Sequence, residues 1–269
     1  MATGGVLNGK YEVRGRIGEG SMGEVFEGFD LLLQRRVVIR ALRAGLKPGS
    51  PERQRFLREA GIVCGFVHPF IASVYEIMEA GDDIYILSEH VEGRPLSAIL
   101  LERGRLSLEE CLGVLDPVCQ AVDAAHRAHI LHGDLKPGNI MILPGGYVRV
   151  VDFALAREAK DSIARLTSAE RDGTLAYIAP EQVRGQARAA SDVYSLGVCL
   201  FEMLTGTVPF GGPDMAVQKE RMLFTPPSQV VPGIPKGMDA LVSELLAVDP
   251  AKRIDEPLLL LERLKKALP

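Results

Sequence analysis

A polar loop in the middle of the chain carries the kinds of side chain that phosphoryl transfer needs. Residues 132–139 read HGDLKPGN, which places Lys136 two residues and Asn139 five residues after Asp134. A carboxylate can accept the proton of a hydroxyl nucleophile, an ammonium can neutralise a transferred phosphoryl group, and an amide oxygen can hold a metal ion. Asp152 follows a predicted strand and adds a second acid. Because this spacing suits one mechanism, we favour a catalytic loop over a merely solvated one.

A glycine-rich turn lies near the start of the chain. Residues 17–25 read IGEGSMGEV, so that Gly18, Gly20 and Gly23 form a GxGxxG pattern before Val25. The pattern alone is weak evidence, because dinucleotide-binding turns have the same spacing. Here it falls between two predicted strands and does not open a helix. That context indicates a hairpin whose backbone amides cover phosphates, and it argues against a dinucleotide site.

The elements that must position these groups change in kind along the chain. Hydrophobic patterns predict strands in the first part at residues 11–17, 24–29, 36–42, 71–76 and 84–90. Ser50 followed by Pro51 predicts the start of the one helix among them. A hinge is expected at residues 89–93.

After the hinge the pattern is mainly helical. Residues 107–110 match a capping box, and Pro117 predicts a local kink inside the helix that follows. The apolar run 191–205, closed by Gly206, predicts a fully buried helix. Short strands are expected at residues 140–143 and 147–151.

Composition excludes several classes of protein. The 269 residues are 47% hydrophobic and 25% charged, as in ordinary soluble globular proteins. The net charge of −4 gives no reason to expect nucleic acid or an anionic membrane as partner. The four cysteines lack metal-ligand spacing. The most apolar stretch, residues 193–204, is too short to cross a bilayer. We therefore expect that no part of this chain inserts into a membrane. We also expect a cytoplasmic location, either for the chain by itself or for the chain as the cytoplasmic domain of a longer protein.

Together these motifs resemble those of the eukaryotic-type Ser/Thr protein kinases, and their wording is most similar to bacterial members. Further matches are Gly173-Thr174, the Ala-Pro-Glu of residues 179–181, the helix start at residues 191–197, and Arg253 as the partner of Glu181. The resemblance implies an α+β, bilobal protein-kinase fold, with a small antiparallel sheet and one main helix in the first lobe and a larger helical second lobe. It implies one kinase domain over residues 11–269, divided into lobes 11–90 and 91–269 after a flexible N-terminus at residues 1–10.

The resemblance also implies roles for single residues, with ATP and Mg²⁺ as cofactors. Asp134 and Lys136 would act on the substrate hydroxyl and the transferred phosphate, while Asn139 and Asp152 would hold Mg²⁺. Glu59 would pair with the basic residue of the third strand. The positions expected to contact ATP are Ile17, Gly18, Gly20, Gly23, Val25, Val38, Arg40, Ser88, Glu89, Val91 and Met141. Among these, Glu89 and Val91 would use their backbones, and Ser88 would be a small gatekeeper. A hydrophobic column linking the lobes is expected from Val63, Val74, His132 and Phe153.

Two departures from the family pattern concern nucleotide binding. Residues 37–40 read VVIR where the family has Val-Ala-Ile-Lys, so Arg40 replaces the lysine that anchors ATP. Arginine keeps the charge, but it is longer, planar and forked. Arg40 could still pair with Glu59 and yet misplace the phosphates. Val38 replaces a small alanine that packs on adenine, and its extra methyl groups would crowd the nucleotide.

Two other departures concern regulation. Gly133 replaces an arginine that commonly binds a phosphate on the activation segment, so control by phosphorylation of Thr167, Ser168 or Thr174 is not expected. Ala154 replaces the glycine after Asp152-Phe153, and alanine restricts positive φ.

Three functions remain open from the sequence. The first is an ATP- and Mg²⁺-dependent Ser/Thr protein kinase impaired by Arg40, acting on a protein substrate. The second is a pseudokinase, a nucleotide-binding or scaffolding module that engages a regulatory protein partner. The third, a small-molecule kinase, is disfavoured because the segments at residues 173–181 and Arg253 resemble a peptide-binding activation segment.

Overall fold

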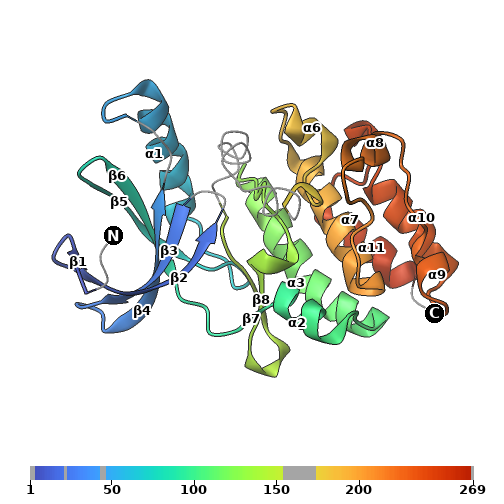
Figure 1. The fold of residues 1–269 in the computed structure, drawn as a ribbon, viewed down its shortest axis with the longest axis horizontal. Coiled ribbons are helices and arrows are strands. Elements are labelled where there is room, and N and C mark those ends of the chain that lie inside the picture. Colours follow the sequence, from blue (N-terminus) through green and yellow to red (C-terminus); the bar gives the residue numbers. More distant parts are fainter. Residues whose placement is uncertain (1–3, 21–22, 43–46, 154–173, 268–269) are drawn as a thin grey trace.

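The protein has two lobes, one built mainly from strands and the other mainly from helices (Figure 1). The computed structural model describes residues 4–20, 23–42, 47–153 and 174–267, without the side chains of Glu52, Arg55 and Glu59. Within these residues, no helix is long and apolar enough to cross a membrane.

The first lobe is a six-stranded antiparallel sheet in the order β1-β2-β3-β4-β6-β5. Its strands are β1 Val6–Leu7, β2 Tyr11–Gly20, β3 Gly23–Asp30, β4 Arg35–Leu42, β5 Val74–Ala80 and β6 Asp83–Glu89. The glycine-rich turn joins β2 to β3 in a hairpin, as its sequence context predicts. The strand predicted at residues 71–76 lies farther along, as β5. β1 pairs with β2, so the sheet begins inside the segment for which the sequence predicts a flexible N-terminus.

The main helix of this lobe is α1 (Pro51–Cys64). It begins as predicted, because the Ser50 side chain accepts a hydrogen bond from the Arg53 amide and Pro51 occupies the first turn. Phe56 and Ala60 on its buried face pack in one cluster with apolar residues of β4 and β6. The helix is thereby fixed against the sheet beside the strand that carries Arg40.

The second lobe is helical, with a small three-stranded sheet next to the hinge. That sheet contains β7 Arg94–Pro95, β8 Ile140–Ile142 and β9 Val148–Val150. The α-helices among the described residues of this lobe are α2 Leu96–Arg103, α3 Leu108–Arg127, α6 Pro180–Val183, α7 Ala189–Thr205, α8 Met215–Glu220, α9 Pro227–Val230, α10 Lys236–Leu245 and α11 Pro257–Ala267. Single 3₁₀ turns lie at Pro137–Asn139, Pro144–Gly146 and Pro250–Lys252.

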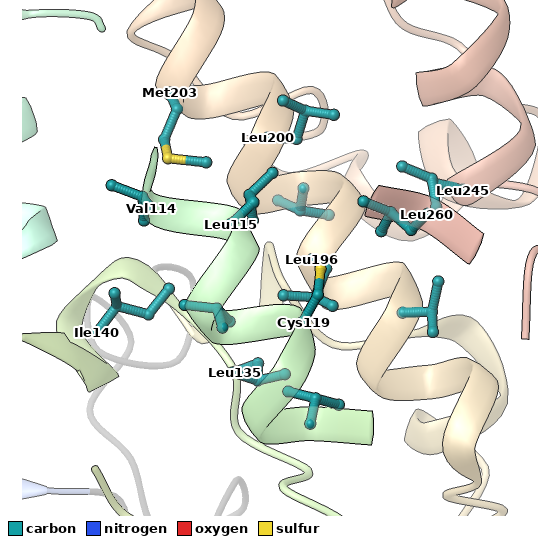
Figure 2. Close-up of a cluster of buried hydrophobic side chains, with 14 of the residues drawn as sticks. Val114, Leu115, Cys119, Leu135, Ile140, Leu196, Leu200, Met203, Leu245 and Leu260 are labelled. Atoms are coloured by element: carbon teal, nitrogen blue, oxygen red, sulfur yellow. The ribbon is translucent and has the colours of Figure 1, made fainter. Parts of the chain in front are cut away.

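Helices α3 and α7 lie together in the core of this lobe (Figure 2). Leu115 and Cys119 of α3 meet Leu196 and Leu200 of α7, and all four side chains are fully buried. Helix α3 has the predicted capping box and runs on through the proline in its interior. Helix α7 starts two residues before the predicted position and ends at Gly206, whose φ of 80° is the left-handed conformation that glycine favours. These buried helices form the rigid support of the loop that contains Asp134.

Candidate active site

The polar groups of the central loop converge as the sequence predicts. The Lys136 Nζ lies 2.8 and 3.0 Å from the two carboxylate oxygens of Asp134. The Asn139 Nδ2 donates to the backbone oxygen of Asp134 at 2.7 Å and to its Oδ2 at 3.3 Å. Because the amide nitrogen serves both contacts, the Asn139 oxygen is the group suited to a metal ion. The loop therefore joins a carboxylate, a cation and an amide oxygen in one cluster.

This loop is attached to helix α7 by Asp192, a residue to which sequence reasoning assigned no role. Asp192 is 1% exposed, and its carboxylate accepts from the backbone amides of His132 and Gly133 at 2.9 and 2.7 Å. The His126 Nε2 lies 2.8 Å from the same carboxylate. An acid near the start of a largely apolar predicted helix was the available signal, because a buried charge needs partners. Asp192 thus sets the position of the backbone just before Asp134.

The backbone conformation at position 133 itself favours a glycine, apart from the loss of the arginine that the family commonly has there. Its φ is 70°, in the left-handed region where a side chain is strained. Its amide is bonded to Asp192 and its carbonyl oxygen accepts from the Gln182 Nε2 at 2.5 Å. Gly133 therefore links the catalytic loop to both α7 and α6.

A cavity of about 950 Å³ lies where the lobes meet. The predicted ATP-contacting residues that line it are Ile17, Val25, Val38, Arg40, Ser88, Glu89, Val91 and Met141, and Asp152 also reaches it. Gly18, Gly20 and Gly23 lie in the β2–β3 hairpin but are not among the lining residues. Sequence reasoning missed Ile86, which lies two residues before Ser88 and so shares its face of the strand. It also missed Ala72, Ile99 and Ile142.

The guanidinium of Arg40 forms an ion pair with Asp152, and both residues line the cavity. The Arg40 Nη2 donates to the Asp152 Oδ1 at 2.5 Å, and both side chains are largely shielded from water. Asp152 has a φ of 65°, which is uncommon for a residue with a side chain. The pairing of Arg40 with Glu59 concerns a side chain outside the described part of the structure, so it stays a prediction. Arg40 therefore neutralises the carboxylate that was expected to hold a metal ion.

The donor set around Asp152 fits Mg²⁺ in its chemistry. The Asn139 amide oxygen and the Asp152 carboxylate are hard oxygen ligands. The Val151 amide donates to the Asn139 backbone oxygen at 3.0 Å, which links the segments that carry these two residues. The described residues contain no group of three or more His, Cys, Asp or Glu side chains able to hold a metal. Mg²⁺ usually keeps several waters and is bound by one or two carboxylates together with substrate phosphates, so the Asp152 carboxylate and the Asn139 oxygen suit such a site.

The four residues of the predicted hydrophobic column belong to one large buried cluster or contact its members. The rings of His132 and Phe153 lie 4.6 Å apart, and Phe153 belongs to the same buried cluster as Val63, against which Val74 packs. Burial lowers the pKa of His132, so its imidazole is neutral at neutral pH. The ring lies 3.0 Å from the Val151 oxygen through Nε2 and accepts from the Asp134 amide through Nδ1. The column thus connects α1 and β5 to the two loops of the site.

The side chain of Glu89 is held by contacts that leave its carbonyl oxygen for adenine. Its carboxylate accepts from the Ser73 amide at 3.1 Å and from the guanidinium of Arg149 on β9. Arg149 also donates to the Pro69 oxygen at 2.6 Å. The Glu89 amide is bonded to the Ser73 oxygen at 2.8 Å, so an adenine contact by Glu89 has to use its carbonyl. These bonds join the hinge to β9 of the second lobe.

Val38 allows a direct test of crowding in the cavity. Its side chain lines the cavity on β4 opposite Ser88 of β6. Val38→Ala is expected to tighten ATP binding between about fivefold and a hundredfold, because overpacking of this size costs roughly 1–3 kcal/mol. Calorimetric titration with ATP and Mg²⁺ measures the change. Val13→Ala, a buried valine of β2 outside the cavity lining, is the control for general loosening of the sheet. An unchanged affinity for Val38→Ala would show that the cavity already accommodates the larger side chain.

The predicted partnership between Glu181 and Arg253 is confirmed. Two nitrogens of the Arg253 guanidinium lie 2.7 and 2.8 Å from the two carboxylate oxygens, and both side chains are buried. The Ser191 hydroxyl donates to the same carboxylate at 2.7 Å. This cluster fixes α6 and the segment before it on the helical lobe. The predictions for Ala154, Thr167, Ser168 and Gly173 fall on residues outside those described.

Comparison with known proteins decides the family. The sequence profile described as the protein kinase domain matches residues 11–262, nearly the whole chain. The chain is a protein kinase domain. This kinase domain is 39% identical over 262 residues to a probable serine/threonine-protein kinase, PknB, of Bifidobacterium longum, covering 92% of this chain and 38% of that protein. It is 37% identical over 257 residues to the serine/threonine-protein kinase PknA of Mycobacterium tuberculosis, covering 93% of this chain and 59% of that protein. The chain thus spans less than two thirds of the length of these relatives.

Solved structures confirm the fold of the kinase domain. The crystal structure of the Mycobacterium tuberculosis PknI kinase domain matches it with a TM-score of 0.78 and 23% identity, covering 100% of both chains. A second crystal structure of that kinase domain gives a TM-score of 0.79. The bilobal α+β protein-kinase fold predicted from the sequence is therefore correct.

Proposed function

We propose that this chain is a Ser/Thr protein kinase domain that transfers the γ-phosphoryl group of ATP to protein hydroxyls, with a rate limited by Arg40. The observation that carries the proposal is the cluster of Asp134, Lys136 and Asn139 beside a cavity of nucleotide size. Its similarity to named bacterial Ser/Thr kinases supports the same activity. Protein substrates and a cytoplasmic location belong to this proposal, as does the division into lobes 11–90 and 91–269.

The residues of the helical lobe would perform the chemistry. Asp134 would accept the proton of the substrate hydroxyl and orient its oxygen. Lys136, now paired with Asp134, would turn to the transferred phosphate and neutralise its charge. Bound Mg²⁺, held by Asn139 and Asp152, would neutralise phosphate charge. Since these groups are fixed by Asp192 and Val151, little reorganisation of the loop is needed.

The residues of the strand lobe would set the pose of the nucleotide. Val25, Val38 and Met141 would enclose adenine, while the backbones of Glu89 and Val91 would bind its edge. Arg40 would have to leave Asp152 before it could contact phosphate, because its guanidinium now neutralises that carboxylate. The planar, forked guanidinium is well suited to pairing with a carboxylate. It is less suited to a position that ordinarily holds the compact ammonium of a lysine. We infer that Arg40 lowers the rate by misplacing the phosphates.

Arg40→Lys tests the proposal. The variant is expected to raise kcat/KM for a Ser/Thr protein substrate by up to about a hundredfold, the effect of correcting a misplacement of roughly 1 Å. Phosphate transfer from labelled ATP to dephosphorylated casein measures it. Arg14→Lys, an exposed arginine of β2 paired with Glu12, is the matched control and should leave the rate unchanged. A thermal shift of the unaltered protein with ATP and Mg²⁺ reports nucleotide binding independently.

A second candidate function is a pseudokinase that binds nucleotide or scaffolds a protein partner. The Arg40–Asp152 contact favours it, because an internal cation already occupies the expected metal ligand. Absence of activity in Arg40→Lys, together with no effect of Asp134→Asn, would favour this function over catalysis. Absence of any thermal shift at millimolar ATP would exclude the nucleotide-dependent form of both.

A further inference from the structure

Lys219 of α8 is a buried lysine that the proposed mechanism does not use. It is 5% exposed, whereas lysines are almost never fully buried without partners. Its Nζ donates to the backbone oxygens of Leu175 and Ile178, at 2.5 and 2.7 Å. One side chain from α8 thus bonds two residues of a short turn that precedes α6.

The turn that Lys219 bonds, residues 174–178, is also held from the side of α7. The Tyr177 backbone oxygen accepts from the Ser195 hydroxyl at 2.9 Å, and the Tyr177 hydroxyl donates to Glu202 at 2.5 Å. Within the turn, the Tyr177 and Ile178 amides bond back to Thr174 and Leu175. The turn is therefore fixed between α7 and α8, with Lys219 as the contact from α8.

The chemistry of the contact suits an amine in either protonation state. Burial lowers the pKa of Lys219 to about 7, although Glu181 acts to raise it. The Lys219 Nζ lies 5.5 Å from the Tyr194 ring, and the guanidinium of Arg253, paired with Glu181, lies 4.9 Å from the same ring. A neutral amine has two N–H donors and an ammonium has three. The two bonds to the turn are therefore available on both sides of neutral pH.

The turn lies close to the catalytic loop. It leads into α6, whose Gln182 donates to the Gly133 oxygen one residue before Asp134. The resemblance to protein kinases places residues 173–181 at the end of the activation segment, where a peptide is bound. A displacement of the turn would therefore move the binding surface for the substrate relative to the Asp134 carboxylate.

We propose that Lys219 is a positioning residue for the protein substrate, because it fixes the turn at residues 174–178 beside the catalytic loop. The proposal rests on the proposed kinase function and deepens it. Lys219 touches neither nucleotide nor the reacting groups. Its replacement should therefore raise the KM for a peptide substrate and leave the binding of ATP unchanged.

The test compares Lys219→Met with Lys236→Met, an exposed lysine of α10, both in the Arg40→Lys chain. Lys219→Met is expected to raise KM for a Ser-containing peptide by roughly tenfold, the effect of losing one to two hydrogen bonds, with KM for ATP unchanged. Hydrogen exchange should become faster in the segment 174–179 and stay unchanged in α7. Lys219→Gln still offers an NH₂ donor, on a shorter side chain, and should give an intermediate effect. If Lys219→Met fails to fold, Lys219→Gln replaces it in the test.

Exchange that stays slow in residues 174–179 of the folded variants would overturn the assignment of Lys219 to the turn. Equal changes in KM for ATP and for peptide would show a general structural role and overturn the positioning role. If the Arg40→Lys chain transfers no phosphate at all, the proposed function fails and the substrate role fails with it. The exchange measurement then still decides whether Lys219 holds the turn, so the two failures are distinguishable.

Discussion

Asp134→Asn is expected to lower the rate of phosphoryl transfer by a factor of about 10² to 10⁴, the usual contribution of a positioned general base. Asparagine has nearly the same shape, but its amide cannot take a proton from a hydroxyl. It also loses the ion pair with Lys136, whose Nζ lies 2.8 Å from the carboxylate. The rate is measured by phosphate transfer to casein, in the unaltered chain and in Arg40→Lys.

The binding of ATP should not change in Asp134→Asn, because Asp134 is not among the residues that line the cavity. Asp116→Asn provides a matched control, since Asp116 lies on α3 in an exposed ion pair with Lys265. An unchanged rate in both backgrounds would contradict the assignment of Asp134 as the base. A fall in nucleotide affinity of the same size would instead indicate damage to the whole site.

Arg253→Met is expected to lower the free energy of unfolding by about 3–5 kcal/mol, the usual effect of removing one partner of a buried ion pair. Glu181 is 4% exposed and would remain as a buried carboxylate without its guanidinium. The backbone oxygens of Ala190, Ala247 and Val248 would lose a donor as well. Equilibrium unfolding in urea measures the change. Arg263→Met is the control, because its pair with Glu244 is half exposed and spans 3.8 Å.

The pH dependence of Arg253→Met follows from Glu181. Burial acts to raise the pKa of Glu181, but the bonds from Arg253 and Ser191 outweigh it and hold the pKa below the ordinary 4.5. A lowered folded-state pKa gives stability that is present above the unfolded value and is lost as pH falls through the folded value. The difference between the unaltered protein and Arg253→Met should therefore shrink below about pH 4.5. A difference that is constant down to acid pH would exclude this ion pair as its source.

The short spacing of the polar residues in the sequence was sufficient to predict the catalytic loop. Asp134, Lys136 and Asn139 lie within six residues, so the geometry of one loop and one 3₁₀ turn brings them together. The β2–β3 hairpin was predictable for the same reason, because its two strands are neighbours in the chain. Residues distant in sequence, such as Glu181 and Arg253, were paired only through the resemblance to a family.

Contacts that depend on tertiary packing could not be predicted from the sequence. Arg40 was expected to pair with Glu59, and only the arrangement of β4 against the loop at Asp152 shows that its guanidinium binds the Asp152 carboxylate. Asp192 was visible as an acid in an apolar helix, but the backbone amides that it binds carry no sequence signal. Lys219 was missed because a lysine in a short helix near the surface is ordinarily solvated. In each case the partner is selected by tertiary packing.

The attachment of the catalytic loop to Asp192 has a consequence for cooperativity. The amides of His132 and Gly133 are bonded to a helix whose side chains are almost all buried, so the loop shares the opening free energy of that helix. Most of the sheet in the other lobe packs in two clusters of its own, and Val63 and Val74 connect that lobe to the cluster of this unit. Sequence changes in the strand lobe can therefore alter the binding of nucleotide while the catalytic loop keeps its native geometry. This separation of most of the packing allows the intact loop at residues 132–139 and the altered strand at residues 37–40 to coexist in one chain.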